Sequence, residues 1–411
     1  MGGTCRNCSP CRSAGRCAGL FDGRRQAAVT TDVYFVSAEP SGDDLAVEVI
    51  KELRQLNTST QVEAIGGKRL QSVGLTSPVD VSPLSVVGFV EGIKIYSEVV
   101  KIADEVVELI IKSGARLVVL VDSWGFSIRV ADRLKKRSPD IKIVKLVGPQ
   151  VWATRAGRAR TLSRVVDHLL CIHEFETSFY EPYGLPTTVI GNPALDRTPK
   201  ADGQSFRDKH SIAEDEQIVL ILPGSRGGEI KRVGPTFAEV ARTLSERQPE
   251  APRICVIVSP SVEEQVLAPE AGWPEGTLFV TDETEKYDCM SAADVALACS
   301  GTVTTELAIQ GCPMVVGYKF GLTTWVLAKF LFKSDYATLF NVAADKAVAP
   351  ELIQFDLTAE NCLREIELRL TDPAMAEHQR QEQYEALKAM GWGRKPAHKI
   401  AAETLAGMLA P

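Results

Sequence analysis

Long hydrophobic runs are missing from this sequence of 411 residues. No apolar stretch reaches the ~18–20 residues that a helix needs to cross a bilayer, which excludes a membrane-spanning helix of that kind. Residues 1–31 also lack the apolar core of a secretory signal, so we expect a cytoplasmic protein. An excess of positive charge is absent too, because the net charge is −7 and the pI is about 5.5. This balance argues against a general nucleic-acid-binding protein.

Several chemical signatures are absent from the loops that follow the expected strands. These loops lack the GK[ST] of a phosphate-binding P-loop and the GxGxxG of a dinucleotide-binding fold. No DxD motif stands at a suitable strand end, so we expect neither a metal ion nor another cofactor. The five histidines lie in helical, linker or strand-flanking patterns, so a histidine base is not expected either.

The ten cysteines fall into two groups. Six lie in apolar or helical contexts and are predicted to be buried thiols. The other four, Cys5, Cys8, Cys11 and Cys17, crowd the stretch TCRNCSPCRSAGRC, a spacing that suggests a zinc site. No second Cys/His cluster accompanies them and apolar residues are few, so we instead predict a disordered tail over residues 1–31.

Short β-branched runs alternate with helical patterns from Asp32 onward. Apolar strands without strict alternation, separated by helices, predict a parallel sheet that is covered on both faces. In the first half, helical stretches such as 96–112 separate the expected strands VYFVSA, QVEAIG, RLVVLVD, IKIVKLV, HLLCI and TTVIG.

The same pattern restarts after a polar stretch at 194–216, which we interpret as a linker. The strands expected there are QIVLILP, RICVIVS, TLFVT, DVALAC and PMVVGY, with a helix at 232–247. A helical pattern without a following strand fills 373–409. We therefore predict an α/β protein of two doubly wound, Rossmann-like domains that face a cleft. The predicted parts are 32–200, 215–372 and a helical segment, 373–411, that packs back on the two domains.

Ligands bind such sheets beyond the carboxyl ends of the strands, so the loops there form the candidate site. After VYFVSA come Glu39, Ser41 and Asp43. Ser41 and Asp43 are also good helix N-caps, whereas Glu39 lies at the strand tip facing the expected cleft. After LVVLV comes Asp122, a carboxylate whose partial desolvation suits a general base that deprotonates a hydroxyl. An N-cap of the next helix is the structural alternative for Asp122.

In the second half, the loop after QIVLILP begins with Gly224, Ser225 and Arg226 and continues to Glu229. Glycines, a hydroxyl and an arginine ahead of a helix predict an anion-binding nest. The planar guanidinium of Arg226 fits phosphate oxygens. A salt bridge between Arg226 and Glu229 is the structural alternative.

The stretch ACSGTVTTELAIQG follows the strand DVALAC of the same sheet. Backbone N–H groups at Ser300, Gly301 and Thr302 can bind a diphosphate. Glu306, one turn into the helix, can accept hydrogen bonds from a ribose diol. A capped helix start would explain the Ser and Thr residues without a ligand. Together the two loops predict a nucleotide-diphosphate site in the second domain.

In this order, the loops resemble those of the lipid-A-disaccharide synthase family, which is glycosyltransferase family 19 and has the GT-B fold. The resemblance runs from about residue 33 to 370. Its pieces are SAEPSGD, AIGGKRLQSVGL, VVGFVEGI, VDSWGF, VGPQVWATRAGRARTL, DHLLCIHEFETSFYEPYGLPTTVIGNP, LPGSRGGEIKR, CSGTVTTELAIQGCPMVVGYK and NVAADKAVAPELIQ.

The resemblance implies a particular reaction. UDP-2,3-diacylglucosamine would donate its sugar, with inversion, to the 6-hydroxyl of 2,3-diacylglucosamine 1-phosphate, giving a β-1,6 disaccharide and UDP. The UDP would lie on the second domain, where the resemblance adds Asn341 to the donor-site residues. The acceptor would lie on the first domain, near Ser41, Asp43 and Trp152. Asp122 is then the expected base, with Glu39 as the second catalytic carboxylate.

The sequence departs from the family pattern at several positions. Gly125, Ser127, Thr154, Asn192 and Ala347 stand where the family has Asp, Asn, Trp, His and Glu. Two alternatives to the synthase therefore stay open. One is a related UDP-sugar-binding protein with an altered acceptor or no catalysis. The other is a UDP-sugar 2-epimerase, which shares the two-domain fold but for which no acid/base set is found.

Both implied substrates carry acyl chains, so the resemblance also implies peripheral association with the inner face of the cytoplasmic membrane. Segments 83–96 and 322–333 are the candidate contacts. The second mixes aromatic and aliphatic residues with Lys329 and Lys333, as interfacial helices do, and an inter-domain core helix is the alternative. The sequence leaves open the acyl-chain length, a homodimer, and whether Asp122 or Glu39 is the base.

Overall fold

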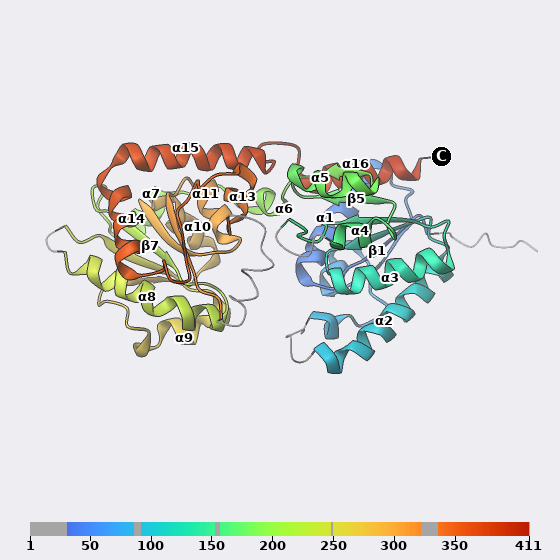
Figure 1. The fold of residues 1–411 in the computed structure, drawn as a ribbon, viewed down its shortest axis with the longest axis horizontal. Coiled ribbons are helices and arrows are strands. Elements are labelled where there is room, and N and C mark those ends of the chain that lie inside the picture. The colour runs from blue at the N-terminus through green and yellow to red at the C-terminus, as the bar shows by residue number, and fades with distance from the viewer. Residues whose placement is uncertain (1–30, 86–91, 153–156, 248–249, 322–335, 411) are drawn as a thin grey trace, which may run out of the picture.

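The computed structural model describes residues 31–85, 92–152, 157–247, 250–321 and 336–410. Within them the chain forms two units that lie side by side, each built on a parallel six-stranded sheet with helices on both faces (Figure 1). The four cysteines of the predicted tail and the segment 322–333 lie outside the described residues, as does part of 83–96.

The first sheet has the strand order β2-β1-β3-β4-β5-β6. Its strands are β1 (Val33–Val36), β2 (Val62–Ile65), β3 (Leu117–Val121), β4 (Lys142–Leu146), β5 (His168–Cys171) and β6 (Thr187–Val189). The helices of this unit are α1 (Pro40–Leu56), α2 (Gly92–Ser113), α3 (Trp124–Arg137), α4 (Gly157–Leu162), α5 (Thr177–Tyr180) and, from the end of the chain, α16 (Ala397–Leu409).

The second sheet has the order β12-β11-β10-β7-β8-β9. Its strands are β7 (Ile218–Leu222), β8 (Arg253–Ile257), β9 (Leu278–Val280), β10 (Val295–Cys299), β11 (Met314–Tyr318) and β12 (Glu351–Ile353). The helices of this unit are α6 (Pro193–Arg197), α7 (Gly203–Lys209), α8 (Gly227–Ser245), α9 (Glu263–Leu267), α10 (Glu283–Ala292), α11 (Val303–Ile309), α13 (Leu339–Ala344), α14 (Ala359–Thr371) and α15 (Pro373–Ala389).

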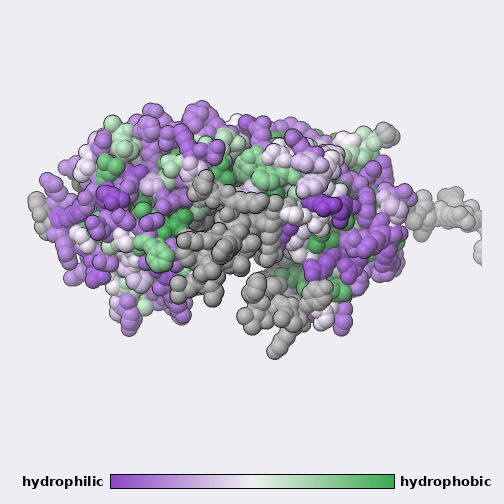
Figure 2. Space-filling model, viewed as in Figure 1, coloured by the Kyte–Doolittle hydropathy of each residue, from purple (hydrophilic) through white to green (hydrophobic). Residues whose placement is uncertain are grey.

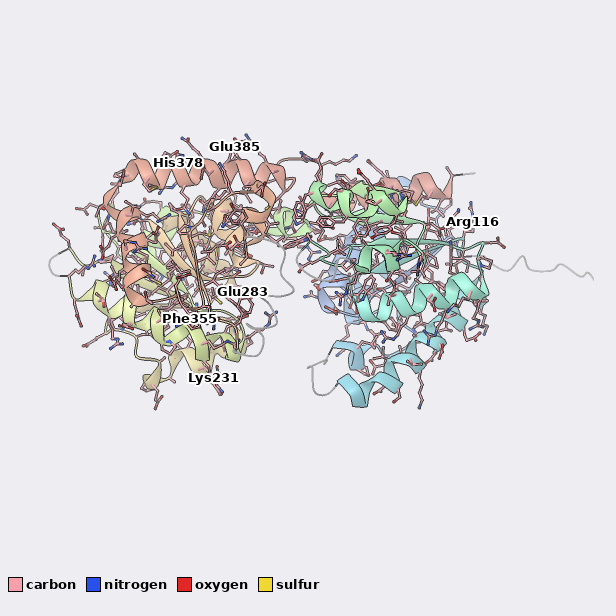
Figure 3. All side chains as sticks on the ribbon, viewed as in Figure 1. Arg116, Lys231, Glu283, Phe355, His378 and Glu385 are labelled. Atoms are coloured by element: carbon pink, nitrogen blue, oxygen red, sulfur yellow. The ribbon has the colours of Figure 1, made fainter. Side chains whose placement is uncertain are left out.

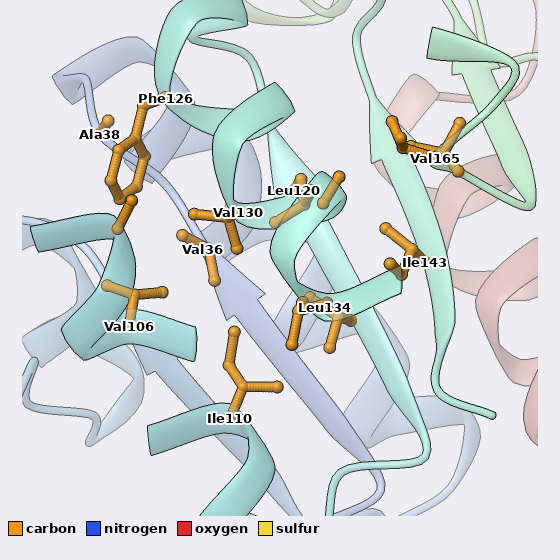
Figure 4. Close-up of a cluster of buried hydrophobic side chains, with 14 of the residues drawn as sticks. Val36, Ala38, Val106, Ile110, Leu120, Phe126, Val130, Leu134, Ile143 and Val165 are labelled. Carbon is orange, nitrogen blue, oxygen red and sulfur yellow. The ribbon is translucent and has the colours of Figure 1, made fainter. Parts of the chain in front are cut away.

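Strand β1 shows why both faces of the first sheet must be covered. All four of its side chains are buried, and successive side chains point to opposite faces of a sheet. Val36 packs among apolar residues of α2 and α3, including Val106 and Val130 (Figure 4). Val33 and Phe35 belong to the core on the other face, which α1 and α16 close. The predicted parallel sheet with two covered faces is confirmed in both units.

The chain crosses between the two units twice. It leaves the first sheet near Gly191, and after α15 has packed on the second unit it returns at Gly391 to form α16. The two crossings touch, because the N–H of Asn192 donates to the Met390 carbonyl at 3.4 Å. A Cβ on Gly391 would lie 3.2 Å from Gly191 Cα. A side chain at Gly391 would therefore crowd the neighbouring crossing.

The structure differs from the sequence-based expectations in three places. The stretch 194–216, interpreted as a linker, contains α7 and most of α6, and Phe206 is buried in the core of the second unit. The helical pattern at 373–409 is two helices, because Gly391 and Gly393 have φ values of +104° and +77° and interrupt it. Strand β12 was not expected, because three residues give too short a hydrophobic pattern.

The surface of both units is mainly hydrophilic in the view of Figure 2, apart from scattered apolar residues. Among the described residues, no helix is both long enough and apolar enough to cross a membrane.

Candidate functional site

Each sheet has one place where the strand order reverses direction. In the first sheet it lies between β1 and β3, and in the second it lies between β7 and β10. Loops leaving two such neighbouring strands turn to opposite faces of the sheet, which opens a crevice at the carboxyl ends. The predicted loops therefore lie at the two switch points, Glu39 and Asp122 at the first and the two polar loops of the second unit at the other.

A cavity of about 630 Å³ lies at the second switch point. This volume falls within the ~300–1,000 Å³ that is typical of small-molecule sites. Gln150 and Trp152 extend to it from the first unit. Glu283, at the start of α10, also lines it, and in Figure 3 this residue lies on the part of the second unit toward the first unit. Seven of the eight predicted donor-site residues line the cavity, namely Gly224, Ser225, Arg226, Ser300, Gly301, Thr302 and Glu306.

The loop after β7 is closed by its own carboxylate. Glu229 Oε2 accepts from the N–H groups of Ser225 and Arg226, at 3.1 and 3.2 Å, and Oε1 accepts from Arg226 Nη1 at 3.1 Å. Gly224 has a φ of +113°, and a Cβ there would lie 2.8 Å from Glu229 Oε2. The salt-bridge alternative is therefore what the structure shows, and Glu229 occupies these two N–H groups of the predicted nest. The Arg226 side chain, 81% exposed, is the cation that this loop offers to a ligand.

A second charge pair joins α10 to α11, beside the loop after β10. Lys286 Nζ, from α10, lies 2.8 Å from Glu306 Oε2, and each side chain is 21% exposed inside the cavity. Burial lowers the pKa of Lys286, but the hydrogen bond and charge of Glu306 outweigh it and leave the pKa above its ordinary value. Sequence reasoning missed Lys286, because nothing in its own segment indicates that α10 faces α11.

Cys299, the last residue of β10, also lines the cavity. Burial, with the nearby Glu229 charge, raises the pKa of its thiol to about 12. A thiolate nucleophile is therefore not available at neutral pH. Among the described residues, no group of three or more His, Cys, Asp and Glu side chains is arranged to hold a metal ion.

Asn341 is the predicted donor-site residue that does not line the cavity. Its side chain is fully buried, where it exchanges hydrogen bonds with the backbone of Ala349 and donates to Glu351 Oε1 at 2.9 Å. The same Glu351 carboxylate accepts from the N–H groups of Ala337 and Thr338, both at 2.7 Å. Residues 337–339 do line the cavity, so Asn341 supports the cavity wall through Glu351.

Glu39 and Asp122 form a carboxylate pair outside the lining of the cavity. Burial raises the pKa of Glu39, the charge of Asp122 raises it further, and a hydrogen bond from Ser123 and the charge of Lys145 oppose this rise. Asp122 and Ser123 both have left-handed backbones, with φ of 41° and 40°. Such conformations are strained for residues with side chains and are concentrated at functional sites. Lys145, which the sequence analysis did not single out, lies buried behind this pair.

The residues predicted for the acceptor side lie in three different environments. Trp152 lines the cavity, edge-on to Phe175 with ring centroids 5.7 Å apart. Ser41 is exposed in the first turn of α1. Asp43 is buried, where it accepts from the Ser37 hydroxyl and from the Gly67 N–H, so it ties α1 to the loop after β2.

Two of the positions that depart from the family pattern have hydrogen-bond partners of their own, and Thr154 lies outside the described residues. The buried Ser127 donates its hydroxyl to the Asp122 carbonyl at 2.7 Å. Asn192 caps α6 by accepting from the Ala194 N–H at 3.0 Å. Gly125 and Ala347 are exposed, and the nearest atom to a Cβ on Gly125 would be Arg129 Nη1 at 3.6 Å.

Two Rossmann-like units with a ligand-sized cavity at the second switch point define the GT-B class of glycosyltransferases and related epimerases. Residues 33–405 match the model of the lipid-A-disaccharide synthetase family. The chain belongs to this family, and it is therefore a glycosyltransferase. The lipid-A-disaccharide synthase of Rhodospirillum centenum is 30% identical over 379 residues, which are 92% of this chain and 94% of that one.

Solved structures of lower sequence identity share the fold. The UDP-GlcNAc 2-epimerase of Neisseria meningitidis, bound to UDP-GlcNAc, has a TM-score of 0.58 at 13% identity, covering 92% of this chain and 99% of that one. A glycosyltransferase from Rickettsia africae has a TM-score of 0.56 at 10% identity, covering 93% and 99%. At these identities the likeness concerns the fold alone, so it lends the epimerase alternative no support as a function.

Proposed function

We propose that this protein transfers the 2,3-diacylglucosaminyl group of UDP-2,3-diacylglucosamine to the 6-hydroxyl of 2,3-diacylglucosamine 1-phosphate, with inversion. Membership of the lipid-A-disaccharide synthetase family over residues 33–405 carries the proposal. The cavity at the second switch point supports it, because it offers a cation, backbone donors and a carboxylate to a nucleotide diphosphate.

In this proposal the donor's UDP occupies the cavity. Its diphosphate lies between the Arg226 guanidinium and the backbone N–H groups of 300–302, which are the types of donor that bind phosphate oxygens. The ribose hydroxyls donate to Glu306, and the Lys286 ammonium, 2.8 Å from that carboxylate, lies close enough for its charge to act on the diphosphate. The open face of the cavity toward Gln150 and Trp152 leaves the sugar between the two units.

The reaction then needs a base on the first unit. The acceptor's hydroxyl oxygen attacks the anomeric carbon, its proton passes to Asp122, and the bond from that carbon to the diphosphate oxygen breaks. UDP leaves with the electron pair, and its new charge is stabilised by Arg226 and Lys286. Glu39 is the second carboxylate of the pair, and burial and the charge of Asp122 raise its pKa above the ordinary value.

We also place the protein at a membrane surface in the cytoplasm, because both proposed substrates carry acyl chains. Segments 83–96 and 322–333 are the proposed contacts. Co-sedimentation with vesicles containing anionic lipid is expected, and deletion of 322–333 is expected to reduce it. Recovery of all the protein in the supernatant would contradict this placement.

The first measurement is mass spectrometry of the purified protein incubated with both proposed substrates in detergent, with EDTA and without added metal. A disaccharide phosphate formed in equal amount with UDP is the expected result. UDP binding without any product would instead support a binding relative or a changed acceptor. A UDP-sugar whose 2-position is inverted, formed without the acceptor, would support the epimerase.

A further inference from the structure

Lys145 is a buried lysine on β4, an interior strand of the first parallel sheet. It lies in β4 opposite Leu120 of β3, and its side chain is 1% exposed. Nζ lies 3.3 Å from the Leu120 carbonyl and 3.4 Å from the Leu146 carbonyl, and it also donates to the Asp122 carbonyl. Three acceptors match the three N–H donors of an ammonium group, which has no lone pair to accept with.

These contacts hold the strained backbone that presents the proposed base. The Asp122 carbonyl accepts from Lys145 Nζ and from the Ser127 hydroxyl, while the Asp122 N–H donates to the Leu146 carbonyl at 2.9 Å. A residue with φ of 41° keeps that conformation only when its surroundings over-determine it. Lys145 donates one of the three hydrogen bonds that hold the Asp122 backbone in this conformation.

Lys145 also sets the charge behind the carboxylate pair. The charged groups that face it are Asp122, which follows β3, and Glu39, which precedes α1. Burial lowers the pKa of Lys145 to about 7, and the two carboxylates oppose this effect. Burying a lysine is costly, and a methionine would fill similar space without that cost. A role in packing alone therefore does not explain a lysine at this position.

We propose that Lys145 is a positioning residue for the transfer reaction: its ammonium group fixes the Asp122 backbone and holds a positive charge behind Asp122 and Glu39. The inference rests on the proposed role of Asp122 as the base. Lys145 itself is enclosed by the sheet and acts through Asp122, so it does not contact the substrates.

The test compares three variants by kcat, KM and pH profile. Lys145→Met is expected to lower kcat about 10- to 100-fold, because a small misplacement of a reacting group has an effect of that size. KM for the UDP-sugar should stay within about twofold, since the donor cavity is untouched. The acid limb of the kcat profile should move to higher pH, because the carboxylates lose the cation that favours their ionised forms.

Two matched variants separate charge from geometry. Ser127→Ala removes a neutral donor to the same Asp122 carbonyl, so it should lower kcat without moving the acid limb. Lys142→Met removes an exposed lysine from the same strand and should leave kcat and the profile unchanged. An unchanged kcat in Lys145→Met, or a lower kcat with an unmoved acid limb, would overturn the proposal.

A second readout needs neither activity nor a folded Lys145 variant. In protein labelled with ¹³C-lysine, the Lys145 side-chain signal should titrate at a lower pH in Asp122→Asn and in Glu39→Gln than in the wild type, since each change removes a charge that favours the ammonium form. A midpoint that neither variant moves would overturn the proposal. If the wild type is inactive but the two variants shift the Lys145 titration midpoint, the transfer reaction is contradicted, whereas the charge interaction of Lys145 with Asp122 and Glu39 is supported.

Discussion

Lys286 and Glu306 form an ion pair inside the cavity, with Nζ and Oε2 2.8 Å apart and both side chains about four-fifths buried. The pair joins α10 to α11, and it places a cation and an acceptor side by side where a nucleotide diphosphate would lie. Partial burial makes such a pair stronger than one at the surface, because water screens it less. The two members should therefore have separable effects on ligand binding.

Glu306→Ala is expected to weaken the binding of both UDP and uridine about tenfold, the order of one hydrogen bond to a charged group. Lys286→Met should weaken UDP by a similar factor but leave uridine nearly unchanged, because its charge acts on the diphosphate. Isothermal titration calorimetry with both ligands measures this. Lys231→Met, an exposed lysine on α8, is the control (Figure 3). Equal losses for uridine in both variants would refute the assignment.

Glu229→Ala is expected to lower the free energy of unfolding by about 2–3 kcal/mol, because two backbone N–H groups and the Arg226 guanidinium lose a charged acceptor. Denaturant unfolding measures the change. Glu239→Ala, on an exposed position of the same helix, should cost less than about 0.5 kcal/mol. Equal stability of the two variants would mean that the carboxylate does not close the loop.

Asp122→Asn should lower kcat about 10²- to 10⁴-fold, the usual range for loss of a general base, and leave UDP affinity unchanged. Product formation and calorimetry measure the two effects separately. Asp140→Asn, at an exposed position between α3 and β4, is the control and should have normal activity. Full activity of Asp122→Asn would transfer the role of base to Glu39 or to another group.

Asn341→Ala is expected to destabilise the protein by about 2–4 kcal/mol, because the buried N–H and carbonyl of Ala349 lose their Asn341 partner and Glu351 loses one of its donors. It should also raise KM for the UDP-sugar, since Glu351 holds the cavity wall at 337–339. Thermal unfolding and steady-state kinetics measure both effects. A raised KM with normal stability would show instead that Asn341 contacts the ligand directly.

Glu176 predicts a pH dependence of stability. Its side chain is buried, and burial raises its pKa from 4.5 to about 7, while a hydrogen bond from the His173 N–H opposes the rise. Between these two pH values the folded state keeps a proton that the unfolded chain has released. Stability must therefore fall as the pH rises through this window.

Glu176→Gln removes that dependence and can keep the acceptor for His173. Relative to the wild type, the variant should gain stability as the pH rises from 5 to 7.5, by up to about 3 kcal/mol for a shift of this size. Urea unfolding across that range measures the difference. Glu174→Gln, two residues away and exposed, should follow the wild type at every pH. A constant difference between Glu176→Gln and the wild type would refute the raised pKa.

The architecture was predictable because buried parallel strands are nearly continuous apolar runs. RLVVLVD and QIVLILP became β3 and β7, and the polar loops after them lie at the switch points where the strand order required them. The strand missed, β12, has three residues and begins with Glu351, whose carboxylate accepts a hydrogen bond from Asn341, ten residues earlier in the chain. A hydrophobic pattern in the sequence does not predict such a side-chain hydrogen bond.

Charges inside the fold were the least predictable part of the candidate site. Lys145 and Lys286 are ordinary lysines in the sequence, and only the packing of β4 against β3 and of α10 against α11 gives them their partners. The closure of the β7 loop, by contrast, was detectable. Arg226 and Glu229 stand three residues apart at a helix start, which is the spacing of a capping box. An anion bound in the predicted nest and the Glu229 carboxylate of the capping box would need the same N–H groups, those of Ser225 and Arg226. In the structure Glu229 accepts from both.

The return of α16 to the first unit makes that unit discontinuous in the chain. Ala397, Ala401, Ala402 and Leu405 fill a core whose other buried residues come from the first half. A fragment ending at residue 200 would expose the apolar face of α1, so it is expected to aggregate rather than fold. During synthesis, likewise, part of one face of the first sheet stays uncovered until α16 has left the ribosome.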